Sequence, residues 1–129
     1  MKKMTEQKRF SLISRIKSAN NAWRGVLIFM RSTHNAWLQI FFGLLAVYLG
    51  FLLHISSVEW VLIIFCIGFV ILAETINTAI EIDIDLTSPT YHPYARDTKD
   101  VAAGAVLIVV FMASLVGLII FLPKILALL

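Results

Sequence analysis

Charged residues are scarce in this sequence. They make up 15% of its 129 residues, whereas a soluble domain usually has about 25%. Hydrophobic residues make up 60%, which is more apolar surface than a chain of this length can bury in a core of its own. The composition therefore excludes an ordinary soluble domain and predicts that lipid surrounds most of the chain.

Cysteine is nearly absent, and the common nucleotide-binding motifs are missing. The single cysteine, Cys66, lies inside an apolar run, so it can form neither an internal disulfide nor a zinc cluster. We expect it to be a small packing residue. The sequence has no GxxxxGK[ST] motif and no glycine-rich loop after a strand, which excludes the usual soluble nucleotide-binding sites.

Three long apolar segments are present instead. They are residues 36–54, 60–82 and 101–122, and each is near the roughly 20 residues that a helix needs to cross a bilayer. We expect Pro123 to close the third segment. The sequence therefore predicts an all-α integral membrane protein of one domain, residues 1–129, with three transmembrane helices.

The two connections between these segments differ. Residues 55–59 form a short turn without a basic residue, whereas residues 83–100 form a longer loop. Pro89 and Pro93 predict that this loop is ordered but not helical.

Basic residues are concentrated on one side of the predicted membrane. Eight of the eleven lie within residues 1–31, and Arg96 and Lys99 lie in the longer loop. By the positive-inside rule, the N-terminus and this loop are cytoplasmic and the C-terminus is outside.

Residues 10–31 are expected to form an amphipathic helix in the membrane interface. At 100° per residue, six apolar side chains share one face, and three basic side chains spaced by seven form an edge beside it. The apolar residues are Leu12, Ile16, Ala19, Trp23, Leu27 and Met30, and the basic ones are Lys17, Arg24 and Arg31. A basic juxtamembrane helix with no further role remains the alternative.

The second half of the middle segment carries polar residues where lipid is expected. Glu74, Asn77, Glu81 and Asp85 fall within about 80° of arc and rise about 16 Å along a helix. Asn77 and Thr78 could serve only as hydrogen-bonding contacts between helices, and Asp85 could be a solvated helix end. Glu74 has no basic residue in the three segments to neutralise it, so it is a functional-site hypothesis.

The longer loop adds cations near the cytoplasmic end of this polar stripe. His92, Arg96 and Lys99 could bind phosphate, and the carboxylates could hold magnesium, which takes oxygen ligands. The pattern indicates a site at the water–lipid boundary for a phosphate donor and a lipid headgroup. A small proton-conducting or ion-coupled membrane protein remains an alternative on these residues alone.

At these residues the sequence resembles a known family. The segments AETINTAIE (73–81), YHP (91–93) and KDVAAGAVLI (99–108) are similar to the small prokaryotic diacylglycerol kinases and undecaprenol kinases. The resemblance covers residues from about 15 to 122 and includes the triplet WRG (23–25). It implies a multi-pass kinase of the bacterial plasma (inner) membrane, with three membrane helices and a surface helix, working as a homotrimer with shared active sites.

The resemblance also implies the reaction. ATP with magnesium as cofactor would phosphorylate a membrane lipid alcohol, either diacylglycerol to phosphatidate or undecaprenol to undecaprenyl phosphate, in phospholipid and cell-envelope lipid metabolism. The segment YHPYARDTKDVAAGAV (91–106) is more similar to the undecaprenol kinase branch. No nucleic-acid partner is expected. The alternative of another class is a non-enzymatic relative that binds lipid or acts as a scaffold.

Residue roles are implied by position in the family's motif. Glu74 would be the catalytic base, Asn77 would position the hydroxyl, and Glu81 would bind the metal. Trp23 would contact the lipid substrate, although an interfacial aromatic anchor is an equal alternative. The residues implied to bind nucleotide are Glu81, Thr90, Tyr91, His92, Lys99 and Asp100.

One position departs from the family's pattern. The family usually has a second metal-binding glutamate ten residues after the tryptophan, and this sequence has Thr33 there. A neutral hydroxyl is a poorer magnesium ligand than a carboxylate. We therefore expect Glu81 with phosphate oxygens and water, or another acid, to hold the metal, or else weak activity. His34 does not compensate, because imidazole suits zinc better than magnesium.

Overall fold

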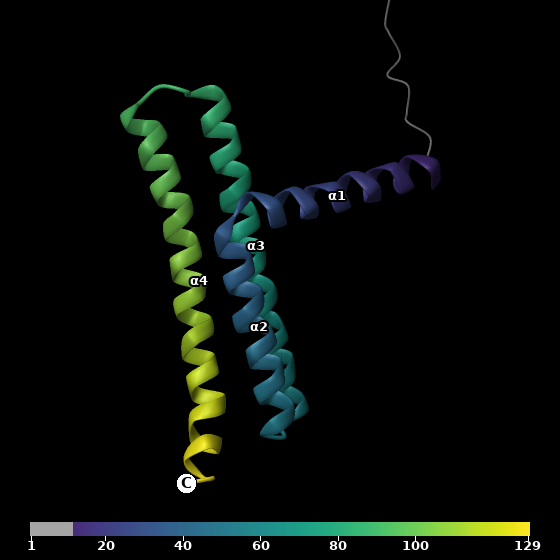
Figure 1. The fold of residues 1–129 in the computed structure, drawn as a ribbon, viewed down its shortest axis with the longest axis vertical. Coiled ribbons are helices and arrows are strands. Elements are labelled where there is room, and N and C mark those ends of the chain that lie inside the picture. The colour runs from purple at the N-terminus through teal and green to yellow at the C-terminus, as the bar shows by residue number, and fades with distance from the viewer. Residues whose placement is uncertain (1–11) are drawn as a thin grey trace, which may run out of the picture.

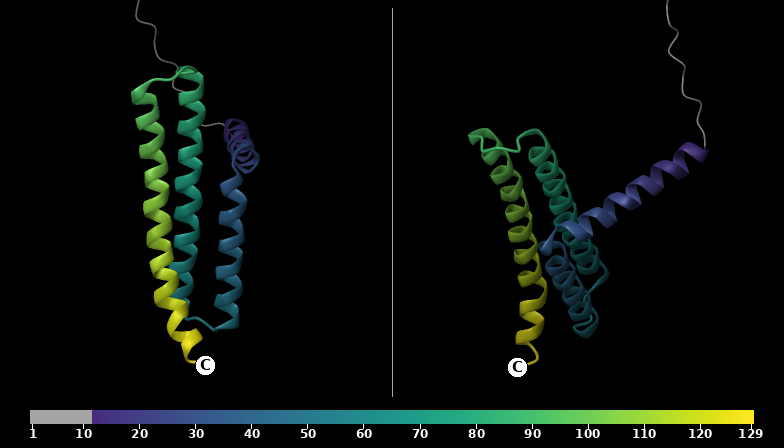
Figure 2. Two further views of the ribbon diagram at one scale, coloured as in Figure 1. Left: turned by 60° about the vertical axis from the view of Figure 1, so that its left-hand side comes forward. Right: turned by 45° about the horizontal axis from the view of Figure 1, so that its top comes forward.

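The computed structural model describes residues 12–129 and places nearly all of them in helices. The four helices are α1 (Leu12–Ser32), α2 (His34–Leu52), α3 (Ser57–Thr87) and α4 (Pro93–Leu126). Figures 1 and 2 show that α2, α3 and α4 run side by side in alternating directions, whereas α1 leaves the bundle steeply. The predicted all-α architecture is confirmed.

Three of these helices are long and apolar enough to cross a membrane: α2, α3 and α4. They overlap the three predicted segments. With 31 and 34 residues, α3 and α4 are about 46 and 51 Å long at 1.5 Å per residue, whereas a hydrocarbon core is about 30 Å thick. Both helices therefore extend beyond the apolar layer, and in Figure 1 their connected ends project past the level of α1.

The predicted loop over residues 83–100 is wrong in length. The helix α3 continues to Thr87 and α4 begins at Pro93, so only residues 88–92 connect them. Pro93 occupies the first helical turn, where its missing N–H would have no helical partner in any case. The imidazole Nδ1 of His92 caps α4 by accepting a hydrogen bond from the Tyr94 N–H at 3.3 Å.

The prediction that Pro123 closes the last helix is also wrong. A proline removes one backbone donor, but the hydrogen bonds resume behind it, and the Ala127 N–H donates to the Pro123 carbonyl at 3.1 Å. Lys124 then pairs with Glu59 of α3 at 3.3 Å. Glu59 also forms a reciprocal capping box with Ser56. The end of α4 is thereby attached to the start of α3.

The surface helix α1 matches the described part of the predicted interfacial helix. Its start at residues 10 and 11, and the basic residues Lys2, Lys3, Lys8 and Arg9, lie outside the described residues. On its predicted apolar face, Leu12, Ile16, Trp23 and Leu27 are exposed. A helix that runs away from the spanning helices at a steep angle, with its apolar side uncovered, is suited to the membrane interface (Figure 1).

Few apolar side chains are buried in this structure. A hydrophobic cluster of Ile55, Ile63, Ile120 and Phe121 lies at the end of the bundle with the α2–α3 turn, which we call the turn end. The other end, with residues 88–92, is the loop end. Many large apolar side chains of α2, α3 and α4 are exposed, as expected for helices surrounded by lipid.

Candidate functional site

The buried polar side chains lie together on α3. Glu74, Asn77 and Thr78 are 2%, 6% and 4% exposed, and they are the buried polar or charged residues within 12–129. The Thr78 hydroxyl donates to the Glu74 backbone carbonyl at 2.9 Å, so its own helix satisfies it. Glu74 and Asn77 are therefore the buried polar side chains whose burial is not explained by a hydrogen bond to the backbone of their own helix.

Glu74 has a neutral partner from another helix. The Gln39 Nε2 atom of α2 donates to Glu74 Oε2 at 3.3 Å. In the described part of the chain, no lysine or arginine forms an ion pair with this carboxyl group. The predictions did not include Gln39, although it is the one amide or charged side chain within residues 36–53. A single polar side chain in an apolar membrane segment is itself a reason to predict a functional residue, and this would have identified Gln39.

Two cavities share Glu74. A polar cavity of about 350 Å³ is lined by Ser32, Thr33, Asn35, Glu74, Asn77, Glu81, Ala103 and Val106. An apolar cavity of about 700 Å³ lies between α2, α3 and α4, and its lining includes Asn35, Gln39 and Glu74. It continues along α4 as far as Phe121, toward the turn end. The Glu74 side chain thus stands where a polar and an apolar cavity meet.

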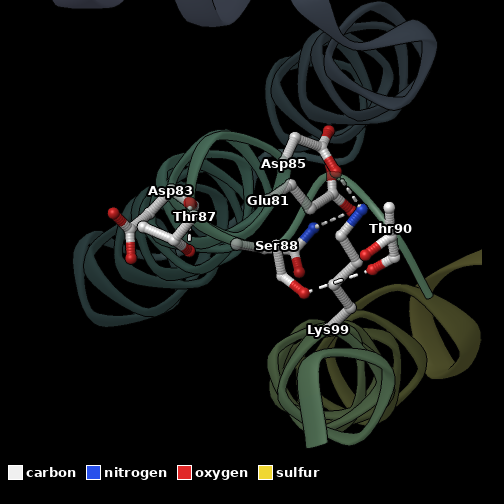
Figure 3. Close-up of polar contacts among 8 residues, drawn as sticks. Glu81, Asp83, Asp85, Thr87, Ser88, Thr90 and Lys99 are labelled. Atoms are coloured by element: carbon white, nitrogen blue, oxygen red, sulfur yellow. Dashed lines mark hydrogen bonds and ion pairs between the residues drawn. The ribbon is translucent and has the colours of Figure 1, made fainter. Parts of the chain in front are cut away.

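The polar stripe continues from Glu74 toward the loop end. The Asn77 Nδ2 atom donates to Glu81 Oε1 at 3.2 Å, while Asn77 Oδ1 is buried without a partner. One helical turn beyond Glu81, Asp85 forms an ion pair with Lys99 of α4. Figure 3 shows Glu81, Asp85 and Lys99 close together and Asp83 on the opposite side of α3. The structure therefore places the four stripe residues on one face.

The neighbouring residues Lys99 and Asp100 of α4 belong to separate ion pairs. Lys99 pairs with Asp85, whereas Asp100 pairs with Arg96 at 3.7 Å. Both members of the Arg96–Asp100 pair are largely exposed. Asp85, rather than the adjacent Asp100, therefore orients Lys99 toward the stripe.

The remaining predicted site residues lie outside both cavities. Thr90 and Tyr91 are exposed in the connection between α3 and α4, and His92 caps α4. Trp23 is 62% exposed on α1. The structure brings Glu74, Asn77 and Glu81 into one cavity. The side chains of Trp23, Thr90, Tyr91 and His92 do not line it.

Thr33 lines the polar cavity together with Glu81. It stands at the junction of α1 and α2, and its hydroxyl donates to the Phe29 carbonyl at 3.2 Å. The position that carries a glutamate in the family's pattern thus faces the same cavity. Its side chain supplies a hydroxyl that is already hydrogen bonded, and no carboxylate.

The oxygen atoms of the polar cavity fit magnesium carried on a phosphate. No group of three His, Cys, Asp or Glu side chains within residues 12–129 is arranged to hold a metal ion. Glu81 nevertheless lines the cavity with its carboxylate, beside Asn77, whose buried Oδ1 atom has no hydrogen-bond partner. Magnesium in nucleotide sites usually takes one or two carboxylates and completes its shell with phosphates and water, so this donor set suits it without an all-protein cage.

Comparison with known proteins places this chain beside membrane lipid kinases. The sequence model of the family described as prokaryotic diacylglycerol kinase matches residues 20–121. Undecaprenol kinase of Bacillus subtilis is 38% identical over 108 residues, which are 84% of this chain and 88% of that protein. Diacylglycerol kinase of Synechocystis is 34% identical over 108 residues, 83% of this chain and 62% of that protein. Diacylglycerol kinase of Escherichia coli K12 is 30% identical over 105 residues, 76% of this chain and 80% of that protein.

Proposed function

This chain belongs to the prokaryotic diacylglycerol kinase family, and on that premise we propose that this membrane lipid kinase phosphorylates undecaprenol with ATP and magnesium. The observation that carries the proposal is the position of Glu74 at the junction of the polar and apolar cavities. The apolar cavity would hold the hydrocarbon chain of the alcohol. The polar cavity would hold the phosphate end of the nucleotide, so hydroxyl and phosphate would meet at this carboxylate.

Glu74 is the proposed general base. Its carboxylate would accept the hydroxyl proton as the lipid oxygen forms a bond to the γ-phosphorus of ATP. The bond from that phosphorus to the bridging oxygen breaks, and ADP leaves with this oxygen. In phosphoryl transfer most of the catalysis comes from positioning and electrostatics. A carboxylate held by one neutral donor suits that task because no adjacent cation competes for its charge.

The nucleotide would occupy the stripe on the loop-end side of Glu74. Glu81 and Asn77 would hold the magnesium, which when bound neutralises phosphate charge. Lys99 would neutralise phosphate oxygens directly, in competition with its present partner Asp85. Contacts of Thr90, Tyr91, His92 and Asp100 with the nucleotide stay predictions. Their support is that they lie on the same end of the bundle as Lys99.

Two observations favour undecaprenol over diacylglycerol as the acceptor. The identity to the undecaprenol kinase is 38%, against 34% and 30% for the two diacylglycerol kinases. The apolar cavity also has hydrocarbon side chains along most of its length toward the turn end, which suits the ester-free chain of a polyprenol. Apart from Asn35, Gln39 and Glu74, its lining is apolar except for Cys66 and Ser114.

The proposal includes an orientation and an assembly. The loop end would face the bacterial cytoplasm, because the projecting ends of α3 and α4 carry Arg96 and Lys99 there and ATP is cytoplasmic. The C-terminus would then be outside. A homotrimer with sites shared between subunits would cover part of the large apolar side chains that α2, α3 and α4 leave exposed. Trp23 on α1 would contact the lipid or anchor the interface.

A parallel lipid assay tests the proposed function. Purified protein in mixed micelles would receive labelled Mg·ATP with undecaprenol or diacylglycerol, and label is expected mainly in undecaprenyl phosphate. Glu74→Gln is expected to lower the rate by at least about a hundredfold. Thr75→Val is the matched control, because the Thr75 hydroxyl is bonded to its own helix at 2.7 Å and lines neither cavity.

Each other outcome of this assay has a definite meaning. Label mainly in phosphatidate would contradict the acceptor assignment alone. Absence of label in either lipid would contradict the kinase and favour the scaffold. Proton flux through liposomes without ATP would favour the proton-conducting alternative, which gives Lys99 no task.

A further inference from the structure

We propose that Gln39 is a positioning residue that orients the Glu74 carboxylate for proton transfer. This inference rests on the proposed role of Glu74 as the base. The two side chains come from different helices and are 35 residues apart in the sequence, and the Gln39 Nε2 atom lies 3.3 Å from Glu74 Oε2. Among the described residues, this is the one side-chain hydrogen bond that joins α2 to α3.

Gln39 is poorly placed for a purely structural role. Its Oε1 atom is buried and has no partner, and an unpaired buried oxygen destabilises a fold. The neighbouring cavity positions Leu38 and Phe42 are apolar, and an apolar residue at position 39 would avoid that cost. The contact that the amide does make is the one to Glu74. We therefore assign the amide to the carboxylate and not to packing.

A neutral amide is chemically suited to this position. It fixes one carboxylate oxygen by a hydrogen bond and leaves the charge of the group unneutralised, which a lysine or arginine would not. Glu74 Oε1 has no hydrogen bond within the described residues and is left for the lipid hydroxyl. Holding a flexible glutamate in one orientation before the substrate arrives lowers the barrier to reaction, because the ordering is already complete.

The first test separates orientation from binding. Gln39→Met keeps the length of the side chain but removes the donor, and we expect kcat to fall about tenfold. The KM values for ATP and undecaprenol should stay within about twofold, because methionine keeps the length of the side chain and its apolar contacts in the lining of the apolar cavity. Gln39→Asn keeps an amide that is one methylene shorter, and it should show the same loss. Thr75→Val is the control variant.

The second test asks whether Gln39 acts through Glu74. Glu74→Asp withdraws the carboxylate by one methylene and should already break the hydrogen bond. Adding Gln39→Met to Glu74→Asp is then expected to lower kcat less than about twofold, which is a non-additive double-mutant cycle. An equal factor in both backgrounds, or a loss confined to the KM for the lipid, would overturn the inference.

A measurement without turnover distinguishes failure of the inference from failure of the proposed function. In protein with ¹³C-labelled glutamate carboxyls, Gln39→Met should move the Glu74 resonance and leave the Glu59 resonance unchanged. If the wild-type protein phosphorylates neither lipid, the proposed function is wrong, and this resonance still decides whether Gln39 holds Glu74. An unmoved Glu74 resonance overturns the inference whether or not the protein is active.

Discussion

At the scale of single residues, the spacing of the polar stripe was enough to predict that its side chains share one face of a helix. Glu74, Asn77, Glu81 and Asp85 recur at three or four residues, so any helix through them places them together, and the structure does so. Gln39 could not be found in this way. Its partner is 35 residues away on another helix, and helical periodicity carries no information on contacts between helices.

Thr33 gives a residue-scale prediction about the metal. Thr33→Glu would add a carboxylate to the cavity that already contains Glu81, and magnesium prefers such a ligand. We expect the magnesium concentration for half-maximal rate to fall about threefold to tenfold, measured by titration at saturating ATP. Thr33→Gln, which has the same size without the charge, is the control. An unchanged requirement in Thr33→Glu would show that position 33 does not reach the metal.

Lys99 gives a second prediction at this scale. If it neutralises phosphate, Lys99→Met should raise the KM for ATP at least about tenfold, since a charge-assisted hydrogen bond to phosphate is lost. In its present ion pair the Asp85 side chain is 69% exposed and the Lys99 side chain 37% exposed, so solvent screens the pair and it is worth at most about 1 kcal/mol. Asp85→Asn, which keeps the lysine, should therefore change the KM by less than about threefold. An equal effect of the two variants would mean that the pair acts as a structural unit.

At the scale of elements, the predictions identified the helices but misplaced their ends. Hydropathy placed the three spans because their apolar runs are long, but both prolines were assigned too strong an effect. Pro93 begins α4 instead of interrupting it, and Pro123 lies inside the last turns. Proline is tolerated in the first helical turn, where its missing donor has no partner, and this explains Pro93. Pro123 removes one donor from α4, but the helix continues past it for three residues. Composition reveals neither where a helix starts nor whether it continues past a proline.

The α2–α3 turn makes a prediction about stability. A Cβ atom on Gly50 would lie 2.7 Å from the Trp60 ring, so Gly50→Ala must displace a tryptophan that packs against the hydrophobic cluster of the turn end. We expect a loss of about 1–3 kcal/mol, seen as a lower thermal midpoint in detergent. Gly68→Ala is the matched control, since a Cβ atom at that position would have open space around it. Equal midpoints for the two variants would contradict the close packing.

At the scale of the whole molecule, the fold explains how one small chain can have one part of its site inside the membrane and another part in the water beyond the membrane surface. The helices α3 and α4 are longer than a bilayer core requires, and the surplus lies at the loop end beyond the level of α1. An interfacial α1 would place the membrane surface near the α1–α2 junction. Glu74 then lies just below that surface, beside Gln39 in the second turn of α2, while Lys99 lies above it. The sequence predicted the spans, whereas the proposed homotrimer would depend on surfaces that one chain leaves exposed.

The proposed orientation can be tested on the intact protein in membranes. In a Cys66→Ser background, Tyr91→Cys places a thiol in the exposed loop-end connection and Ser57→Cys places one at the start of α3, both at exposed positions. A membrane-impermeant maleimide should label residue 91 in inside-out vesicles and residue 57 in right-side-out vesicles. The reverse pattern would place Lys99 on the side of the membrane without ATP. Because the polar stripe runs from Glu74 toward Lys99 at the loop end, the proposed kinase site would then face away from its phosphoryl donor.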